Sequence, residues 1–167
     1  MADKHCIVIR DLPSQDAVNY RFGKLTTEID NGHVIALTEM IDHDLWAADA
    51  APQKADDNLW LVTGVELMYE EYPRKHLWDY YNEANKAFRC ERVLAGGIYS
   101  ISKEGLVIAD EATDLVKGAA VMFNAGSNAL TVAATAAGTV IGKVIDVYTK
   151  SGVKFAAIQF EKHAATV

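Results

Sequence analysis

The sequence has 167 residues, half of them hydrophobic and 23% charged, a composition typical of one domain or of two small subdomains that share a core. Its 23 acidic residues outnumber 16 basic ones, and the net charge of −7 disfavours nucleic acid or an anionic membrane surface as the main partner. No apolar run approaches the ~18 residues that a membrane-spanning helix needs.

The two cysteines, Cys6 and Cys90, are far apart in the sequence and belong to no Cys/His spacing of a zinc site. We expect two free, partly buried thiols, with a single disulfide between them as the alternative. The start of the chain is polar, and the apolar run that follows is too short for a signal peptide. We therefore expect synthesis in a reducing cytoplasm.

The first 22 residues are expected to form a strand followed by an extended arm. A run rich in β-branched residues ends near Pro13, and residues 14–22 have no clear period. An apolar edge strand is a liability unless it is paired, so we expect the arm, residues 1–22, to bind a neighbouring subunit. Residues 23–167 are then the body of the protein. The residues of the arm expected to bind the partner are Cys6, Ile7, Val8 and Ile9.

The clearest local pattern of the body lies near its beginning. Residues 24–29 and 33–38 are strand-like, and Asp30, Asn31 and Gly32 separate them. Asn-Gly favours the positive φ angles of a type I′ turn. This pattern predicts a β-hairpin over residues 24–38.

Residues 47–58 lack strand and helix periodicity and indicate an exposed connector. A strand is predicted to follow over residues 59–68, with Trp60 and Val62 on one face and Leu61 on the other.

Residues 69–92 combine aromatic and charged side chains. The apolar spacing from Leu77 to Phe88 fits about three turns of an amphipathic helix, and a long loop is the alternative. The aromatic side chains could cover the core, form a protein-interaction patch, or stack on sugars or bases. The residues of this segment expected to bind a protein partner are Tyr72, Trp78 and Tyr80.

From residue 92 onward the pattern is β. Hairpins are predicted across residues 124–128 and 150–152, and Gly142 within a strand indicates a bulge. Short strands separated by turns predict a mainly β fold, an antiparallel barrel or sandwich with long loops and at most one or two short helices. The body can divide into two subdomains, about residues 23–92 and 93–163.

No sequence pattern of a known catalytic site, phosphate-binding loop or metal site is found. Asp42, His43 and Asp44, with His33 nearby, are the residues closest to a metal-binding cluster. Successive residues of a strand point to opposite faces, so these side chains are expected to form a solvated turn instead. We expect no catalytic residues, no bound metal and no cofactor.

Three stretches of the second half resemble the β-barrel of bacteriophage head decoration proteins, which cement the capsid. They are Asp114–Val121, Asn128–Val132 and Gly138–Ile145, in which an Ile-Gly-hydrophobic strand follows a tract of small residues. Ile29–Leu37 is similar to the N-terminal part of such proteins. The resemblance covers residues 24–161 loosely and leaves 66–92 unmatched.

The resemblance implies a virion protein without an active site. Such a protein would lie on the outer face of the capsid, bind the major capsid protein and bridge neighbouring capsomers, and a homo-oligomer such as a trimer remains open. The acidic charge agrees with a place outside the DNA-filled shell. The alternatives are another virion component, such as a head-fibre base or tail protein, a non-catalytic binding module, and a small β-barrel enzyme.

Overall fold

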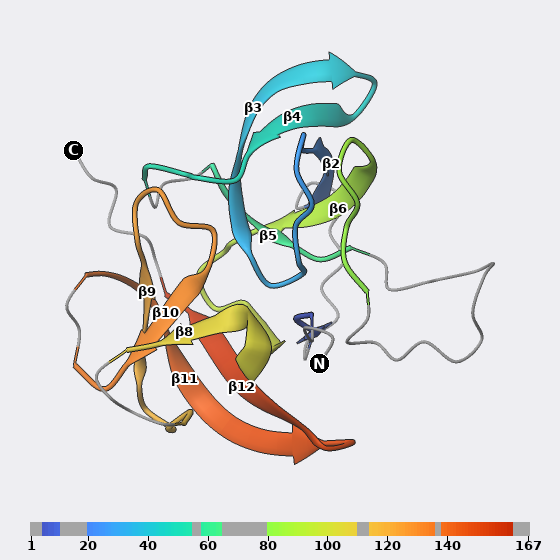
Figure 1. The fold of residues 1–167 in the computed structure, drawn as a ribbon. Helices are drawn as coiled ribbons and strands as arrows, with labels where there is room; N and C mark the ends of the chain where they lie inside the picture. Colours follow the sequence, from blue (N-terminus) through green and yellow to red (C-terminus); the bar gives the residue numbers. More distant parts are fainter. Residues whose placement is uncertain are drawn as a thin grey trace.

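The computed structural model is mainly β, as the sequence predicted, and contains two sheets (Figure 1). The structure describes residues 5–10, 20–54, 58–64, 80–109, 114–135 and 138–161. Within these residues the helical content is one 3₁₀ turn, Lys103–Gly105. Over the same part of the chain, no helix is long and apolar enough to cross a membrane.

The first sheet is a small barrel whose strands pair in the closed order β2-β4-β3-β5-β6. All of its pairs are antiparallel except β2–β4. Its strands are β2 (Tyr20–Lys24), β3 (Val34–Asp42), β4 (Leu45–Asp49), β5 (Leu59–Val62) and β6 (Ala87–Arg92). Its interior is filled by Leu25, Ile29, Ile35, Leu37, Trp60, Val62, Phe88 and Cys90.

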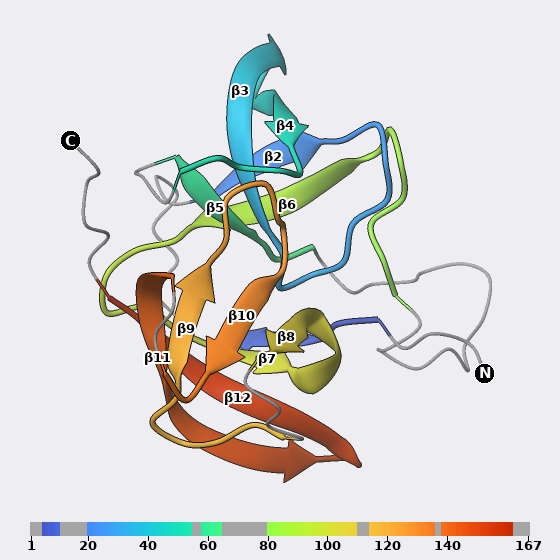
Figure 2. The same cartoon turned by 60° about the vertical axis from the view of Figure 1, so that its left-hand side comes forward.

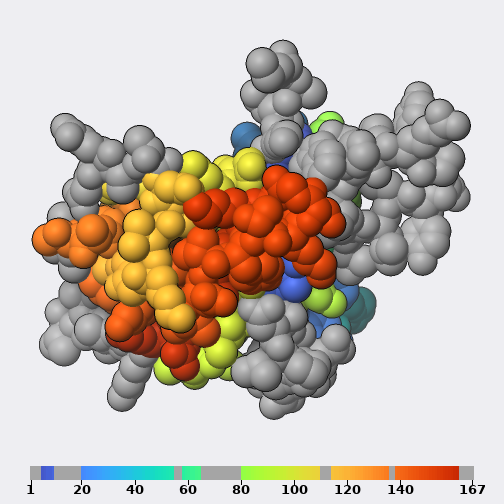
Figure 3. All heavy atoms as spheres, turned by 90° about the horizontal axis from the view of Figure 1, so that it is seen from below, coloured from blue at the N-terminus to red at the C-terminus, as the bar shows by residue number. Residues whose placement is uncertain are grey.

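The second sheet has seven strands in the order β1-β7-β12-β11-β9-β10-β8, with one parallel pair, β10–β8. Its strands are β1 (Val8–Arg10), β7 (Ile98–Ser102), β8 (Leu106–Ile108), β9 (Ala120–Phe123), β10 (Leu130–Ala133), β11 (Thr139–Lys150) and β12 (Val153–Phe160). The face seen from below is formed mainly by β11, β12 and the segment leading to β9 (Figure 3). This face lies opposite the β3–β4 hairpin.

The two sheets share a core because β3 and β5 have apolar residues on both faces. Trp60 and Val62 point into the barrel, whereas Leu59 and Leu61 pack with buried residues of the seven-stranded sheet. This alternation along β5 confirms the predicted faces of the strand. The same core cluster includes Val34 of β3, so the barrel rests on the sheet through its β3–β5 side (Figure 2).

Both predicted C-terminal hairpins are confirmed. β9 pairs with β10, and β11 pairs with β12 across Ser151 and Gly152. The predicted bulge is also present, since the β11–β9 register shifts between Val140 and Gly142. The β11–β12 hairpin lies in the middle of the open seven-stranded order, whereas the closed strand order belongs to β2–β6.

The prediction of a hairpin across Asn31 and Gly32 is wrong. β2 pairs with β4 and β6, and β3 pairs with β4 and β5, so the strands on either side of this turn are not neighbours. Gly32 has a positive φ of 80° and Asn31 does not, whereas a type I′ turn needs both. The Asn31 side chain instead bonds to the main chain of Gly64.

The predicted helix is wrong from residue 80 onward, where the structure describes it. Asn82 forms an isolated bridge with Ile29, and Asn85 has a positive φ of 62°, which a helix does not allow. Phe88 and Cys90 both point into the barrel, which is the two-residue period of strand β6. Leu77 and the preceding aromatic residues lie outside the described residues.

Candidate functional site

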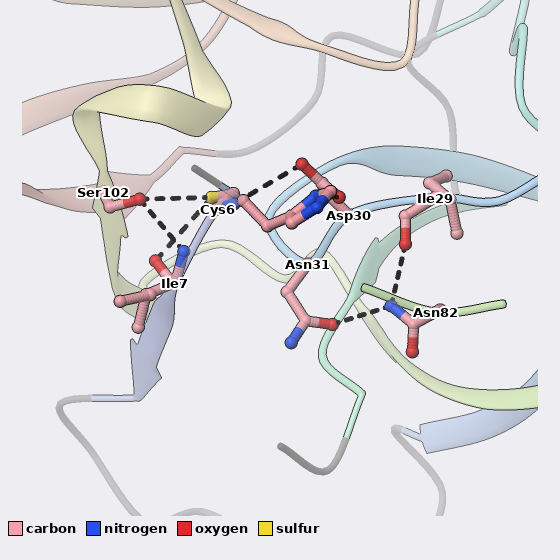
Figure 4. A network of polar contacts seen from close by, with 8 residues as sticks. Cys6, Ile7, Ile29, Asp30, Asn31, Asn82 and Ser102 are labelled. Atoms are coloured by element: carbon pink, nitrogen blue, oxygen red, sulfur yellow. Dashed lines mark hydrogen bonds and ion pairs between the residues drawn. The ribbon is translucent and has the colours of Figure 1, made fainter. Parts of the chain in front are cut away.

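The N-terminal residues expected to bind a partner lie against the body of their own chain. Cys6 and Ile7 are buried, and β1 pairs with β7 through partners such as Val8 and Ile101. Ser102 forms two hydrogen bonds with Ile7. The Ser102 N–H donates to the Ile7 carbonyl at 2.9 Å. The Ser102 Oγ accepts from the Ile7 N–H at 3.0 Å (Figure 4). The arm expected over residues 1–22 therefore contributes residues 5–10 and the start of β2 to the folded body.

Cys6 occupies a slot between the two sheets that is lined by glycine. A Cβ atom at Gly105 would lie 2.0 Å from the Cys6 Sγ, and one at Gly32 would lie 2.8 Å from it. The Ser102 hydroxyl lies 3.6 Å from the same sulfur. We call this packing site of Cys6, formed by Gly32, Ser102 and Gly105, the β1 slot. Its shape requires glycine at two positions far from Cys6 in the sequence.

The chemistry of both thiols is suppressed by burial. Cys6 and Cys90 are free, as expected, and both are buried rather than partly buried. Burial raises the pKa of Cys6 to about 12, and burial likewise raises that of Cys90 to about 12. A thiolate is the nucleophilic form, so neither cysteine is activated for attack near neutral pH. Both side chains therefore act as packing groups.

The expected partner residue Tyr80 belongs to a cluster of hydrogen-bonded side chains, Asn31, Tyr80 and Asn82, which we call the clamp. Its hydroxyl donates to the Asn82 Oδ1 at 3.2 Å. The Asn82 Nδ2 donates to the Asn31 Oδ1 at 3.1 Å and to the Ile29 carbonyl at 3.0 Å (Figure 4). Asn31 accepts from the Gly64 N–H at 2.7 Å and donates to its carbonyl at 3.3 Å. The clamp fixes Gly64 and Asn82 side by side. The other expected partner residues of this segment, Tyr72 and Trp78, lie outside the described residues.

The metal-like cluster of the sequence is a solvated turn, as expected. Asp42, His43 and Asp44 are exposed at the tip of the β3–β4 hairpin, where Asp44 has a positive φ of 58°. The His43 N–H donates to the Asp42 carboxylate at 2.7 Å, a contact that caps the turn. Among the described residues, no group of three or more His, Cys, Asp and Glu side chains could hold a metal ion.

The same hairpin has an apolar surface that the sequence analysis missed. The second half of β3, residues 38–42, is exposed on both faces, and the hairpin projects beyond the barrel in two views (Figures 1 and 2). Met40 is 60% exposed and Ile41 is 52% exposed. The acidic side chains of Glu39, Asp42 and Asp44 are exposed beside them.

Strand β2, which pairs with β4, also has exposed aromatic side chains. Phe22 and Tyr20 are exposed and meet edge to face at 6.3 Å between ring centroids. Phe22 is the register partner of Leu45, the first residue after the hairpin turn in β4. We call Met40 and Ile41, in the exposed end of β3, the tip surface. A signal for it was present in the sequence, because Met40 and Ile41 adjoin an acidic turn where polar residues are usual.

The tip surface has the chemistry of a protein contact. Exposed aromatic residues and methionine are enriched at the centre of protein interfaces, and a polar or charged rim surrounds them. The described acidic groups at the tip make that rim negative. Comparison of the chain with protein-family models, with curated proteins and with solved structures finds no match.

Proposed function

We propose that this chain is a non-catalytic structural protein that binds the outer surface of a bacteriophage capsid and stabilises it, using the tip surface as its contact. The observation that carries this proposal is the projecting β3–β4 hairpin with two large apolar side chains exposed near its end. The resemblance of the sequence to head decoration proteins supplies the identity of the partner, the major capsid protein.

The outer half of β3 favours a docking role because its side chains gain little from their own chain. Residues 38–42 of β3 are exposed, and this half of the strand pairs with β4 but not with β5. Met40 and Ile41 belong to no core cluster of the described residues. Contact with a partner would bury these two side chains and would supply the packing that they lack.

The charge of the tip indicates the chemistry of the partner. Glu39, Asp42 and Asp44 lie around the apolar residues, so a complementary pocket is apolar with basic residues at its rim. Rim charges of this kind set the orientation and the rate of association more than the affinity. A capsid surface presents the same pocket many times, and many weak contacts in a lattice give strong avidity.

The rest of the fold suits a permanent structural part. Each of the five barrel strands pairs with two neighbours, and the β3–β5 side of the barrel shares a core with the second sheet. Regions with many buried apolar contacts resist local opening. The hairpin is thus attached to a rigid support.

The experiment adds the purified protein to expanded heads that lack it and measures the bound copies and the rupture temperature. The Met40→Ser/Ile41→Ser variant should lose about 2 kcal/mol of binding free energy, or about thirtyfold in affinity. The control is Val107→Ser/Val116→Ser, which alters side chains that are 49% and 56% exposed outside the tip surface. It should bind like the unchanged chain.

Absence of binding by the unchanged chain would contradict the capsid role and would favour a tail or non-viral partner. Binding without a rise in the rupture temperature would contradict the stabilising role. Equal losses in the two double variants would contradict the assignment of the tip surface.

A further inference from the structure

We propose that the N-terminal strand is exchanged between two copies of this chain, so that residues 5–10 of one copy occupy the β1 slot of the other. The inference concerns two copies alone and goes beyond the proposed function. It rests on the contacts that bind residues 5–10 to the body, and on the unfilled slot and unpaired strand that result when this segment leaves.

The segment is held entirely by residues far from it in the sequence. His5 pairs with Asp30 at 2.7 Å, and Ser102 holds Ile7 through two hydrogen bonds. Cys6 fills the slot beside Gly105. Each of these partners belongs to the body, and none depends on which chain supplies the segment.

Both faces of the segment are packed. Cys6 and Val8 pack with the core shared by the two sheets, whereas Ile7 packs with Val153 and Phe155 on the other side of the seven-stranded sheet. A chain whose segment is withdrawn therefore has an empty slot and a free apolar strand at the same time. Unpaired strands and sheet edges of this kind associate readily.

The position of β1 makes withdrawal simple. It is an edge strand of three residues with one neighbour, β7, in the strand order. Residues 11–19, which include Pro13, join it to β2. Exchange of an edge element reuses the contacts of the single chain and needs no new interface, which is why it is a low-cost route to dimers. The balance between the two arrangements then depends on protein concentration.

A disulfide between two different chains tests the exchange. One partner is the unchanged protein, which has Cys6 in its strand, and the other is the Cys6→Ser/Ser102→Cys variant, which has a cysteine in its slot and none in its strand; both keep the buried Cys90. The Sγ of Cys6 and the Oγ of Ser102 are 3.6 Å apart, so a cysteine at position 102 is close enough for a bond after a small shift. Neither protein can form this bond within one chain.

The two proteins are mixed, incubated and treated with a mild oxidant, and the products are separated without reductant and mapped by mass spectrometry. We expect a heterodimer linked from Cys6 to position 102, with a yield that rises about tenfold for each tenfold rise in dilute protein. The matched control replaces the variant by Cys6→Ser alone, which should give no such product. The Ser102→Cys single variant shows that the disulfide can form, because its own Cys6 lies beside the new cysteine.

Disulfide formation only within the single variant, with no heterodimer at any concentration, would overturn the exchange. If the single variant forms no disulfide or does not fold, the test is the oligomeric state of the unchanged protein, measured by sedimentation at several concentrations. A concentration-dependent dimer that is lost when residues 1–10 are removed supports the proposal, because the exchange needs this segment. A monomer at every concentration, or a dimer that persists without residues 1–10, overturns it.

Discussion

Replacing Gly105 by alanine should destabilise the protein through one contact, between the new methyl group and Cys6. The added Cβ would lie 2.0 Å from the Cys6 Sγ and 2.6 Å from its Cβ, far inside the contact distance of real side chains. Gly105 does not have a positive φ, so alanine fits its backbone without strain. The cost therefore comes from packing alone.

The size of this cost follows from the ways in which the clash can be relieved. Excess volume in a packed core costs about 1–3 kcal/mol. If β1 leaves the sheet instead, Cys6, Ile7 and Val8 all lose their packing, and Ile7 alone contributes about 1.5–3 kcal/mol. Overpacking is therefore the cheaper route, and it gives a loss of about 2 kcal/mol, or a fall in melting temperature of about 4–8 °C for a chain of this size.

Urea unfolding followed by tryptophan fluorescence and circular dichroism measures this loss. Cys6→Gly removes both atoms that the new methyl group meets, so the double variant should recover at least about 1 kcal/mol relative to the sum of the single changes. Gly138→Ala is the control, because its Cβ meets other atoms only at 3.5 Å or more. A Gly105→Ala variant within about 0.5 kcal/mol of the unchanged chain, or one that Cys6→Gly does not rescue, would refute the slot.

Asn31→Ala should cost about 2–3 kcal/mol in chemical unfolding, because it leaves a buried main-chain donor and acceptor unpaired; a change below about 0.5 kcal/mol would contradict the clamp. Burial lowers the pKa of His33 below 6.5, and the Asp30 carboxylate offsets only part of this. The unfolded chain therefore takes up the proton first, and stability should fall as the pH drops below 6.5 and level off below the folded-state pKa. His33→Gln should reduce this pH dependence, and an unchanged profile would show that another group causes it. Cys6 and Cys90 should react with a thiol reagent only after urea unfolding, and rapid reaction of the native protein would contradict their burial.

The C-terminal half was readable from the sequence because its contacts are local. β9 and β10 are joined by a short connection, as are β11 and β12, and Asn, Ser and Gly residues mark both turns in the sequence. Gly142 predicted the bulge in β11 correctly. Glycine fits there because a Cβ atom would lie 2.8 Å from the Gln159 carbonyl oxygen. In these elements the local pattern and the tertiary packing favour the same structure.

The N-terminal half was harder because distant residues decide its structure. Asn31 and Gly32 form a turn, but the Asn31 side chain bonds to Gly64, 33 positions away, and β2 pairs elsewhere. The apolar spacing around Phe88 fitted a helix as well as a strand, and pairing with β2 and β5 decided for the strand.

The candidate sites were only partly accessible to sequence reasoning. The apolar run from Cys6 to Ile9 was found, but its slot depends on Gly105, which nothing in the sequence connects to Cys6. The tip surface was missed because two register shifts in the β3–β4 pair break the alternation that would have revealed Met40.

Imaging of decorated heads by cryo-electron microscopy tests the central claim most directly. The capsid role predicts density for this protein on the outer face of the shell, with the β3–β4 hairpin pointing toward the major capsid protein and Met40 and Ile41 within contact distance of it. Density at the tail, inside the shell, or on the shell with the hairpin pointing into solvent would contradict the account.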